Sequence, residues 1–130
     1  MKSFDYTKPQ NLSHIPIVCF YVKNIRNNNL IRTYDAILDT GADITLVSFS
    51  VISQIQPIPT KDEISFKVLG RELQSKPYRL SISLDDSTRG IKVYACPDNI
   101  LGADILLGRN YLNRYLVEFD GPNKQVRIHD

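Results

Sequence analysis

The feature that most constrains this chain is a series of short β-branched and aromatic runs, each interrupted by a turn signal. The clearest runs are residues 15–22, 31–38, 78–84 and 91–94. Apolar and polar side chains alternate over 78–84, which is typical of a strand with one buried face. The first hundred residues show no helical pattern of useful length. This pattern predicts strands joined by turns, with one turn at residues 27–29, where asparagine tolerates left-handed backbone angles.

The final third of the chain completes the predicted architecture. Residues 110–115 follow Gly108 and are the best candidate for a short helix, whereas residues 53–60 carry two prolines and are expected to form a loop. Residues 117–119 and 125–128 predict a closing hairpin. Residues 1–13 are polar and are expected to form a flexible arm, which leaves residues 14–130 as a single domain. We therefore predict an all-β fold, a small closed barrel with one short C-terminal helix.

Composition excludes several classes of function. The net charge is only +2 and the basic residues are scattered, so the chain is not expected to bind nucleic acid. No apolar run is long enough to cross a membrane, so no membrane association is expected. Cys19 and Cys96 suit neither a disulfide framework nor a metal site, which favours a reducing compartment and a cytoplasmic location. His14 and His129 have no partners at ligand spacing, so neither a metal nor another cofactor is expected.

The most informative motif is an apolar strand, residues 36–38, that leads directly into Asp39-Thr40-Gly41-Ala42. A carboxyl group placed immediately after a buried strand lies where a catalytic acid can be tuned by its surroundings. Gly41 permits close approach of the backbone, and the small Ala42 leaves space beside the carboxylate. Asp, Thr and Gly are also common in ordinary β-turns, so the motif alone indicates little.

A second motif, the apolar run Ile105-Leu106-Leu107 followed by Gly108-Arg109-Asn110, lies about seventy residues beyond the first. In this order and at this spacing, the two motifs resemble those of the retropepsins, the single-domain aspartic proteases of retroviruses, retroelements and some cells and bacteria. The resemblance covers about residues 15–128. The chain continues beyond the helix into a hairpin, as in non-viral and bacterial members of that family.

The resemblance implies a role for each residue of the two motifs. Asp39 would be the catalytic aspartate, and Thr40 would form a hydrogen bond across a dimer axis. Gly41 would offer its carbonyl to the substrate backbone, and Asp43 would contact the substrate near the end of the cleft. Arg109 would pair with Asp43 to anchor the helix to the active-site loop. An arginine fork is well suited to a carboxylate, and a cation at the start of a helix is otherwise mildly unfavourable.

Family members close a β-hairpin flap over the substrate, and its expected position here is residues 65–74. The tip, which would bind substrate, is then Val68-Leu69-Gly70. Viral flaps are rich in glycine, whereas this segment has one glycine followed by two charged residues. The departure concerns flap mobility and substrate range rather than the chemistry.

The chain has one Asp-Thr-Gly, because the later Gly102-Ala103-Asp104 has no Asp-Thr before it. Aspartic proteolysis needs two carboxylates that share a proton, so the second must come from another copy. We therefore predict a homodimeric aspartic endopeptidase that binds peptides or proteins in extended form. Two alternatives stay open: a dimeric binding or scaffold module with weak or no catalysis, and a zymogen from which residues 1–13 must be removed.

Overall fold

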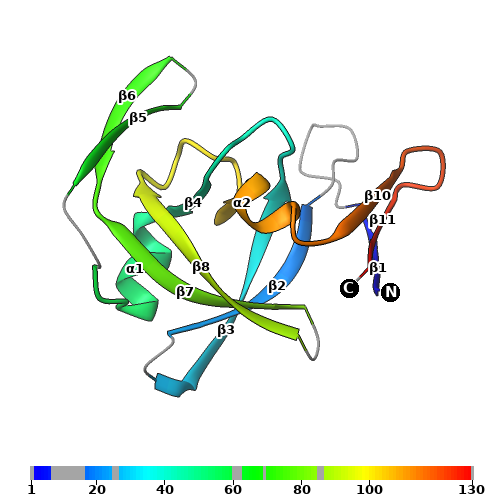
Figure 1. Cartoon of the computed structure of the whole chain (residues 1–130), viewed down its shortest axis with the longest axis horizontal. Coiled ribbons are helices and arrows are strands. Elements are labelled where there is room, and N and C mark those ends of the chain that lie inside the picture. Colours follow the sequence, from blue (N-terminus) through cyan, green and yellow to red (C-terminus); the bar gives the residue numbers. More distant parts are fainter. Residues whose placement is uncertain are drawn as a thin grey trace.

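The computed structural model describes residues 2–6, 17–24, 27–59, 63–68, 70–84 and 87–129. These residues form eleven strands and two short helices (Figure 1). The strands are β1 (Lys2–Asp5), β2 (Ile17–Asn24), β3 (Asn27–Leu38), β4 (Thr45–Ser48), β5 (Ile64–Val68), β6 (Arg71–Ser75), β7 (Pro77–Leu84), β8 (Ser87–Cys96), β9 (Ile105–Leu107), β10 (Leu116–Asp120) and β11 (Gln125–His129). The helices are α1 (Phe49–Ile55) and α2 (Arg109–Leu112). The predominance of strands agrees with the sequence pattern.

Six of the strands are hydrogen-bonded in the order β2-β3-β9-β4-β8-β7, and β7 pairs back onto β2. In this ring, β9 lies between β3 and β4, parallel to the first and antiparallel to the second. The register pairs Leu38 with Leu107. The two sequence motifs, which begin where β3 and β9 end, are therefore brought side by side by the sheet itself.

Apolar residues from these strands fill the interior. Leu80 and Ile82 of β7 are fully buried, as the alternation predicted, and they join Ile91 and Val93 of β8 in the main core. A second apolar cluster, which we call the groove-side cluster, contains the buried residues Leu46, Tyr94, Cys96 and Leu101. The half-buried residues packed against it are Ile44, Phe66, Val68, Leu73, Ile100 and Leu106. One cluster thus supports the fold while the other borders the candidate site.

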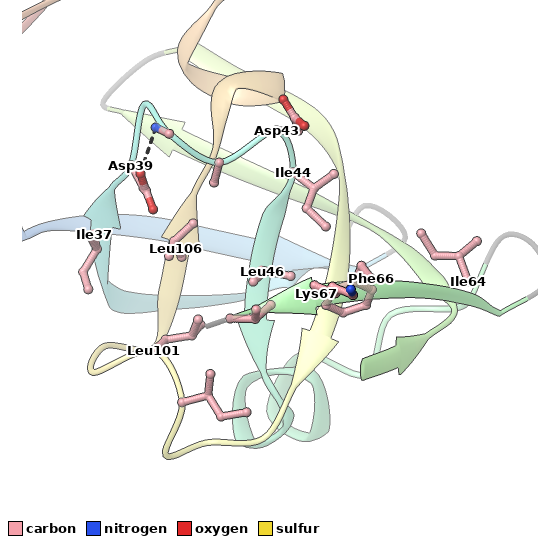
Figure 2. A pocket seen from close by; sticks show the side chains of 14 residues that line it. Ile37, Asp39, Asp43, Ile44, Leu46, Ile64, Phe66, Lys67, Leu101 and Leu106 are labelled. Carbon is pink, nitrogen blue, oxygen red and sulfur yellow. Dashed lines mark hydrogen bonds between the residues drawn. The ribbon is translucent and has the colours of Figure 1, made fainter. Parts of the chain in front are cut away.

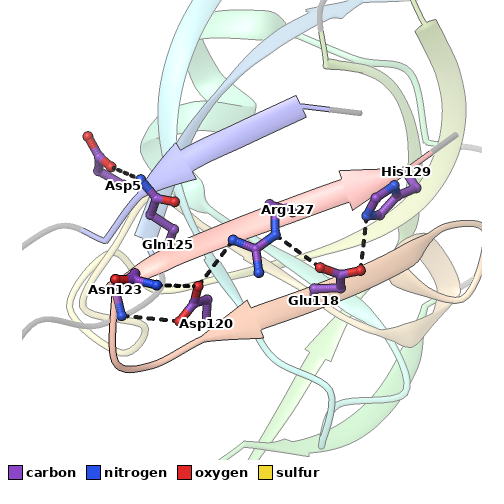
Figure 3. Close-up of polar contacts among 7 residues, drawn as sticks. All are labelled: Asp5, Glu118, Asp120, Asn123, Gln125, Arg127 and His129. Carbon is purple, nitrogen blue, oxygen red and sulfur yellow. Dashed lines mark hydrogen bonds and ion pairs between the residues drawn. The ribbon is translucent and has the colours of Figure 1, made fainter.

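The two ends of the chain meet in a separate three-stranded sheet, β1-β11-β10, which we call the terminal sheet (Figure 1). Its inner face buries Val126 and Ile128 in the main core, together with the half-buried Phe4. Its outer face carries Arg127, which donates hydrogen bonds to Glu118 at 3.0 Å and Asp120 at 3.2 Å (Figure 3). The sheet is therefore apolar towards the core and charged towards the outside.

The flexible arm expected over residues 1–13 is wrong at its beginning, because Lys2–Asp5 forms β1 and pairs with β11. The Tyr6 N–H extends this pairing to the Lys124 carbonyl at 2.7 Å. Polar composition concealed this strand, since its partner lies some 120 residues away in sequence. Residues 7–13 of the predicted arm lie outside the described residues.

The expectation of a single C-terminal helix is also wrong, because α1 lies between β4 and β5. Val51 and Ile55, one turn apart on α1, are buried, and Gln56 ends the helix in a left-handed conformation with φ 53°. The two prolines beyond it had suggested a loop throughout. The second helix begins one residue earlier than predicted and ends at Leu112, and the turn expected at residues 27–29 belongs to β3. Neither helix among the described residues is long and apolar enough to cross a membrane.

Candidate active site

Asp39 is the first residue after β3 and begins a tight turn (Figure 2). Its N–H donates to the Leu107 carbonyl at 3.0 Å, which ties the turn to the end of β9. Its side-chain Oδ1 accepts the Gly41 N–H at 2.9 Å, and its carbonyl accepts the Ala42 N–H at 3.3 Å. These contacts orient the half-buried Asp39 carboxylate along the turn and leave its Oδ2 available for other partners.

Gly108 allows the second motif to approach the first more closely than any other residue would. A Cβ atom at Gly108 would lie 2.1 Å from the Ile44 carbonyl oxygen and 2.9 Å from that of Ala42. Both of these atoms belong to the backbone, so no side-chain movement could relieve the clash. At Gly41 the constraint is milder, since a Cβ atom would lie 3.2 Å from Asp39 Oδ1.

Arg109 contacts the turn through both its backbone and its guanidinium. The backbone N–H donates to the Ala42 carbonyl at 2.8 Å, and Nη1 donates to the Thr40 carbonyl at 3.0 Å. Nη2 forms an ion pair with Asp43, the pairing that the resemblance had implied. The Asp43 side chain is 80% exposed and that of Arg109 is 41% exposed, so this ion pair lies in contact with solvent.

Two further residues join the same turn to α2, and the motifs did not single them out. The hydroxyl of Thr45, which is fully buried, donates to Asn110 Oδ1 at 2.7 Å and accepts the Gly108 N–H at 3.1 Å. Neither motif gave Thr45 a role, and Asn110 had been taken as a helix residue. Only its position next to Arg109 could have drawn attention to Asn110.

A groove of about 710 Å³ opens beside Asp39 (Figure 2). Its lining is mostly apolar and comes from the end of β3, the turn that follows it, β4, β5, β9 and the segment before β9. The lining residues are Ile37, Asp39, Gly41, Ala42, Asp43, Ile44, Leu46, Ile64, Phe66, Lys67, Val68, Ile100, Leu101 and Leu106. Among these residues only Asp39 and Asp43 carry carboxylates, and Asp43 is engaged by Arg109.

The predicted flap is present as the hairpin β5–β6, with Val68 paired to Arg71 across the turn. The hairpin projects from the body of the molecule (Figure 1). Its inner side contributes Val68 to the groove and packs Phe66 against Tyr94, with 5.6 Å between the ring centroids. Gly70 adopts φ 78° in the turn, is exposed and does not line the groove, and Leu69 lies outside the described residues.

Sequence comparison agrees with this geometry. The model of the family described as retroviral aspartyl protease (RVP) matches residues 21–119, most of the chain and both motifs. The chain belongs to the retroviral aspartyl protease family. No curated protein sequence matches it significantly.

Solved structures show the same fold for this member of the retroviral aspartyl protease family. The EIAV protease, complexed with the inhibitor HBY-793, superposes with a TM-score of 0.61 at 15% identity, covering 82% of this chain and 93% of the viral one. A retropepsin-like aspartic protease from Rickettsia conorii gives 0.60 at 15% identity, covering 98% and 89%. The foamy viral protease-reverse transcriptase, in complex with an RNA/DNA hybrid, gives 0.52 at 18% identity, covering 78% of this chain and 12% of that one.

Two other titratable groups of this family member, Cys96 and Asp104, do not line the groove. Burial, with Asp98 as a smaller contribution, raises the pKa of the Cys96 thiol to about 11, so the thiol is uncharged at neutral pH. Asp104 accepts the Asp35 N–H at 3.3 Å and is absent from the groove lining. Within the described ranges, no three His, Cys, Asp or Glu side chains are grouped so that they could hold a metal ion.

Proposed function

We propose that this protein is an aspartic endopeptidase whose active species is a homodimer with paired Asp39 side chains. The observation that carries the proposal is the placement of Asp39 in a turn anchored to β9, beside an apolar groove covered by a hairpin. A peptide in extended form fits a groove with these walls, because its side chains alternate and its backbone needs hydrogen-bonding partners.

The composition of the groove supports the need for a second copy. Within its lining, Asp43 is the only other carboxylate, and an ion pair with Arg109 occupies it. Two carboxylates that share one proton are therefore not available from one chain. A two-fold axis beside the turn would supply a symmetric pair, since a twofold interface brings each residue opposite its own copy.

The dyad would work by moving protons between two carboxyl groups. The ionised Asp39 removes a proton from water as the water oxygen bonds to the scissile carbonyl carbon, while the protonated Asp39 of the partner subunit donates to the carbonyl oxygen. The resulting gem-diol collapses as Asp39 passes the proton it took from water to the amide nitrogen and the C–N bond breaks, while one hydroxyl of the gem-diol gives its proton to the carboxylate of the partner's Asp39. The products are a carboxylic acid and an amine, and the dyad again holds one shared proton. This shared-proton arrangement of aspartic proteases is a standard example of coupled carboxyl groups.

The remaining residues of the turn and flap would support this reaction. Thr40, which is exposed, would form a hydrogen bond with its copy across the axis. The Gly41 carbonyl and Asp43 would bind the substrate backbone, with Ala42 leaving room beside them. We assign the covering of the substrate to the hairpin tip, Val68-Leu69-Gly70.

One observation favours the alternative of a dimeric binding module. The inner side of the flap rests on its own chain through Phe66 and Tyr94, and two charged residues follow Gly70. A flap that opened rarely would retain a bound segment more readily than it would release products. Under this alternative, a peptide would bind in the groove without being cleaved.

Cleavage of a mixed peptide library between pH 3.5 and 7, followed by mass spectrometry, distinguishes the two functions. We expect wild-type protein to cleave and Asp39→Asn, which preserves the size of the side chain, to lose at least about 1,000-fold in kcat, since both carboxyl groups of the dyad are removed. The solution mass of both proteins should correspond to a dimer. Cleavage by the Asp39→Asn dimer at the wild-type rate would refute the proposed dyad. Binding without cleavage by wild type would favour the binding module.

A further inference from the structure

The active-site turn is joined to α2 by two sets of contacts, one in solvent and one buried. The solvent-side set is the Arg109–Asp43 ion pair, whose side chains are 41% and 80% exposed. The buried set centres on the Thr45 hydroxyl, whose residue has no exposed surface. Exposed ion pairs contribute little to holding a structure together, whereas a buried polar group that loses its partner is costly. The buried set should therefore hold the turn more firmly than the ion pair does.

The Thr45 hydroxyl acts both as a hydrogen-bond donor and as an acceptor. Oγ1 donates its proton to Asn110 Oδ1 at 2.7 Å and accepts the N–H of Gly108, which is buried, at 3.1 Å. The Asn110 amide in turn donates from Nδ2 to the Lys92 carbonyl at 2.9 Å. One hydroxyl and one amide thus connect the start of β4, the start of α2 and strand β8.

The position of Thr45, just after the turn that begins at Asp39, means that its hydrogen bonds restrain that turn. Asp39 begins the turn and is bonded to Leu107 at the end of β9. Thr45 follows the turn and is bonded to Gly108, the next residue after Leu107. The two ends of the turn are therefore fastened to consecutive residues, which leaves the Asp39 carboxylate little freedom to shift.

We propose that Thr45 and Asn110 are positioning residues, which act through the turn to hold Asp39 in the geometry that catalysis needs. The proposal rests on the proposed protease function. Neither residue lines the groove, so each would act without touching the substrate. Displacement of a catalytic group by about 1 Å can cost 100-fold in rate, so the loss should appear in kcat.

The activity test compares Thr45→Val, which keeps the shape of the side chain and removes the hydroxyl, with Thr45→Ser, which keeps the hydroxyl. We expect Thr45→Val to lower kcat about 10- to 100-fold per folded dimer with KM changed less than about twofold, and Thr45→Ser to retain kcat within about threefold. Asn110→Ala should lower kcat about as much as Thr45→Val. The double variant should lose little more kcat than either single variant, because both substitutions remove the same Thr45–Asn110 hydrogen bond.

Tyr34→Phe is the control for a merely structural effect. It removes another largely buried hydroxyl, which donates to Gln54 Oε1 at 2.5 Å outside the active-site turn. We expect it to lower the midpoint of urea unfolding with kcat unchanged. Wild-type kcat in the Thr45→Val dimer, alongside a similar loss of stability, would overturn the proposal.

Amide hydrogen exchange tests the same inference without relying on activity. The Ala42 N–H donates to the Asp39 carbonyl within the turn at 3.3 Å. The Arg109 N–H donates from α2 to the Ala42 carbonyl at 2.8 Å. Thr45→Val should speed their exchange at least about 10-fold relative to the core strands, and Tyr34→Phe should not. Unchanged exchange would overturn the proposed positioning. If wild-type protein proves inactive, the protease function fails, and the exchange rates still decide whether Thr45 and Asn110 fix the turn.

Discussion

The turn beneath the groove and the hairpin above it differ in how they are attached to the molecule. The turn is bonded to β9 at its start, to Arg109 along its length and to α2 at its end. The hairpin β5–β6 forms a two-stranded sheet of its own, and its packing contacts come mainly from one side. A short two-stranded sheet is marginally stable alone, so its order depends on these contacts.

This difference is what a groove for long substrates requires. Catalytic groups need fixed geometry, whereas an element that covers the groove must move to admit a chain and release products. Regions that open locally are those with few buried contacts and exposed hydrogen bonds. The comparison predicts that equivalent substitutions will have large global effects in the turn and small local effects in the hairpin.

Gly108→Ala should have the largest effect on stability. The added Cβ atom would lie 2.1 Å from the Ile44 carbonyl oxygen, so the backbone of one motif must move away from the other. We expect a loss of at least about 3 kcal/mol in the free energy of unfolding, measured in urea. Gly121→Ala, where a Cβ atom meets nothing within 4 Å, is the matched control and should change little. Equal stability of the two variants would show that the close approach is not needed.

Phe66→Ala should have a smaller effect, confined to the hairpin. It removes the half-buried ring that packs on Tyr94 and opens the contact with the groove-side cluster. We expect faster amide exchange throughout β5 and β6, with a loss of about 1–2 kcal/mol in global stability. Phe66→Leu, which keeps an apolar side chain, should show a smaller increase in amide exchange and a smaller loss of global stability. A global loss as large as that of Gly108→Ala would contradict the distinction between turn and hairpin.

Gly70→Ala tests the hairpin turn with the same substitution as at Gly108. Nothing lies within 4 Å of the added Cβ atom, so the only cost is the left-handed conformation at φ 78°. That cost is about 1 kcal/mol for an alanine. We expect the urea midpoint to fall slightly and the groove to keep its structure by NMR. A loss of several kcal/mol would mean that the tip is held as rigidly as the turn.

The terminal sheet is a region outside the comparison, and its outer face carries partly exposed ion pairs. A hydrogen bond from Arg127 holds the pKa of the Glu118 carboxyl below its usual value, and hydrogen bonds from Asn123, with a smaller contribution from Arg127, do the same for Asp120. Both groups therefore stabilise the fold when ionised, and this contribution is lost as the pH falls through their lowered pKa values. Stability should decline below about pH 4, the normal range for carboxyl groups.

Arg127→Met should reduce stability at neutral pH slightly and flatten this decline. Arg71→Met, on the exposed side of the hairpin, is the control and should leave the pH profile unchanged. We expect this to be the smallest effect of the series, because ion pairs that remain in contact with solvent contribute little. A pH profile of Arg127→Met parallel to wild type would exclude the terminal sheet as a source of acid sensitivity.

The parts of the site that could be predicted were those in which the residue type is imposed by geometry. Asp39, Gly41, Gly108 and Arg109 stand where close approach or charge pairing leaves few alternatives, and they produce a readable motif. The hairpin was placed within one residue at each end, because the resemblance implies a flap between the two motifs and the alternating strand that begins near Tyr78 marks where it must end. Its contacts with Tyr94 could not be predicted, since they depend on how the hairpin folds back.

Three features were missed because their causes are tertiary. Helix α1 is too short to show a periodic pattern, and it is stabilised by burying Val51 and Ile55 in the core. Strand β1 is polar in sequence and depends on β11 at the other end of the chain. The role of Thr45 becomes visible only when α2 is placed beside β4.

By itself, the sequence determined that the chain is built from strands, that Asp39 ends one of them, and that one chain carries one Asp-Thr-Gly, because these follow from local pattern and residue chemistry. Only the tertiary structure decided that β9 lies between β3 and β4, which brings the two motifs together. This placement also lets the Thr45 hydroxyl form hydrogen bonds with Asn110 and Gly108. The physical reason is that a buried hydrogen bond between residues 65 apart has no local signature. It forms because the fold buries Thr45 and brings the half-buried Asn110 beside it.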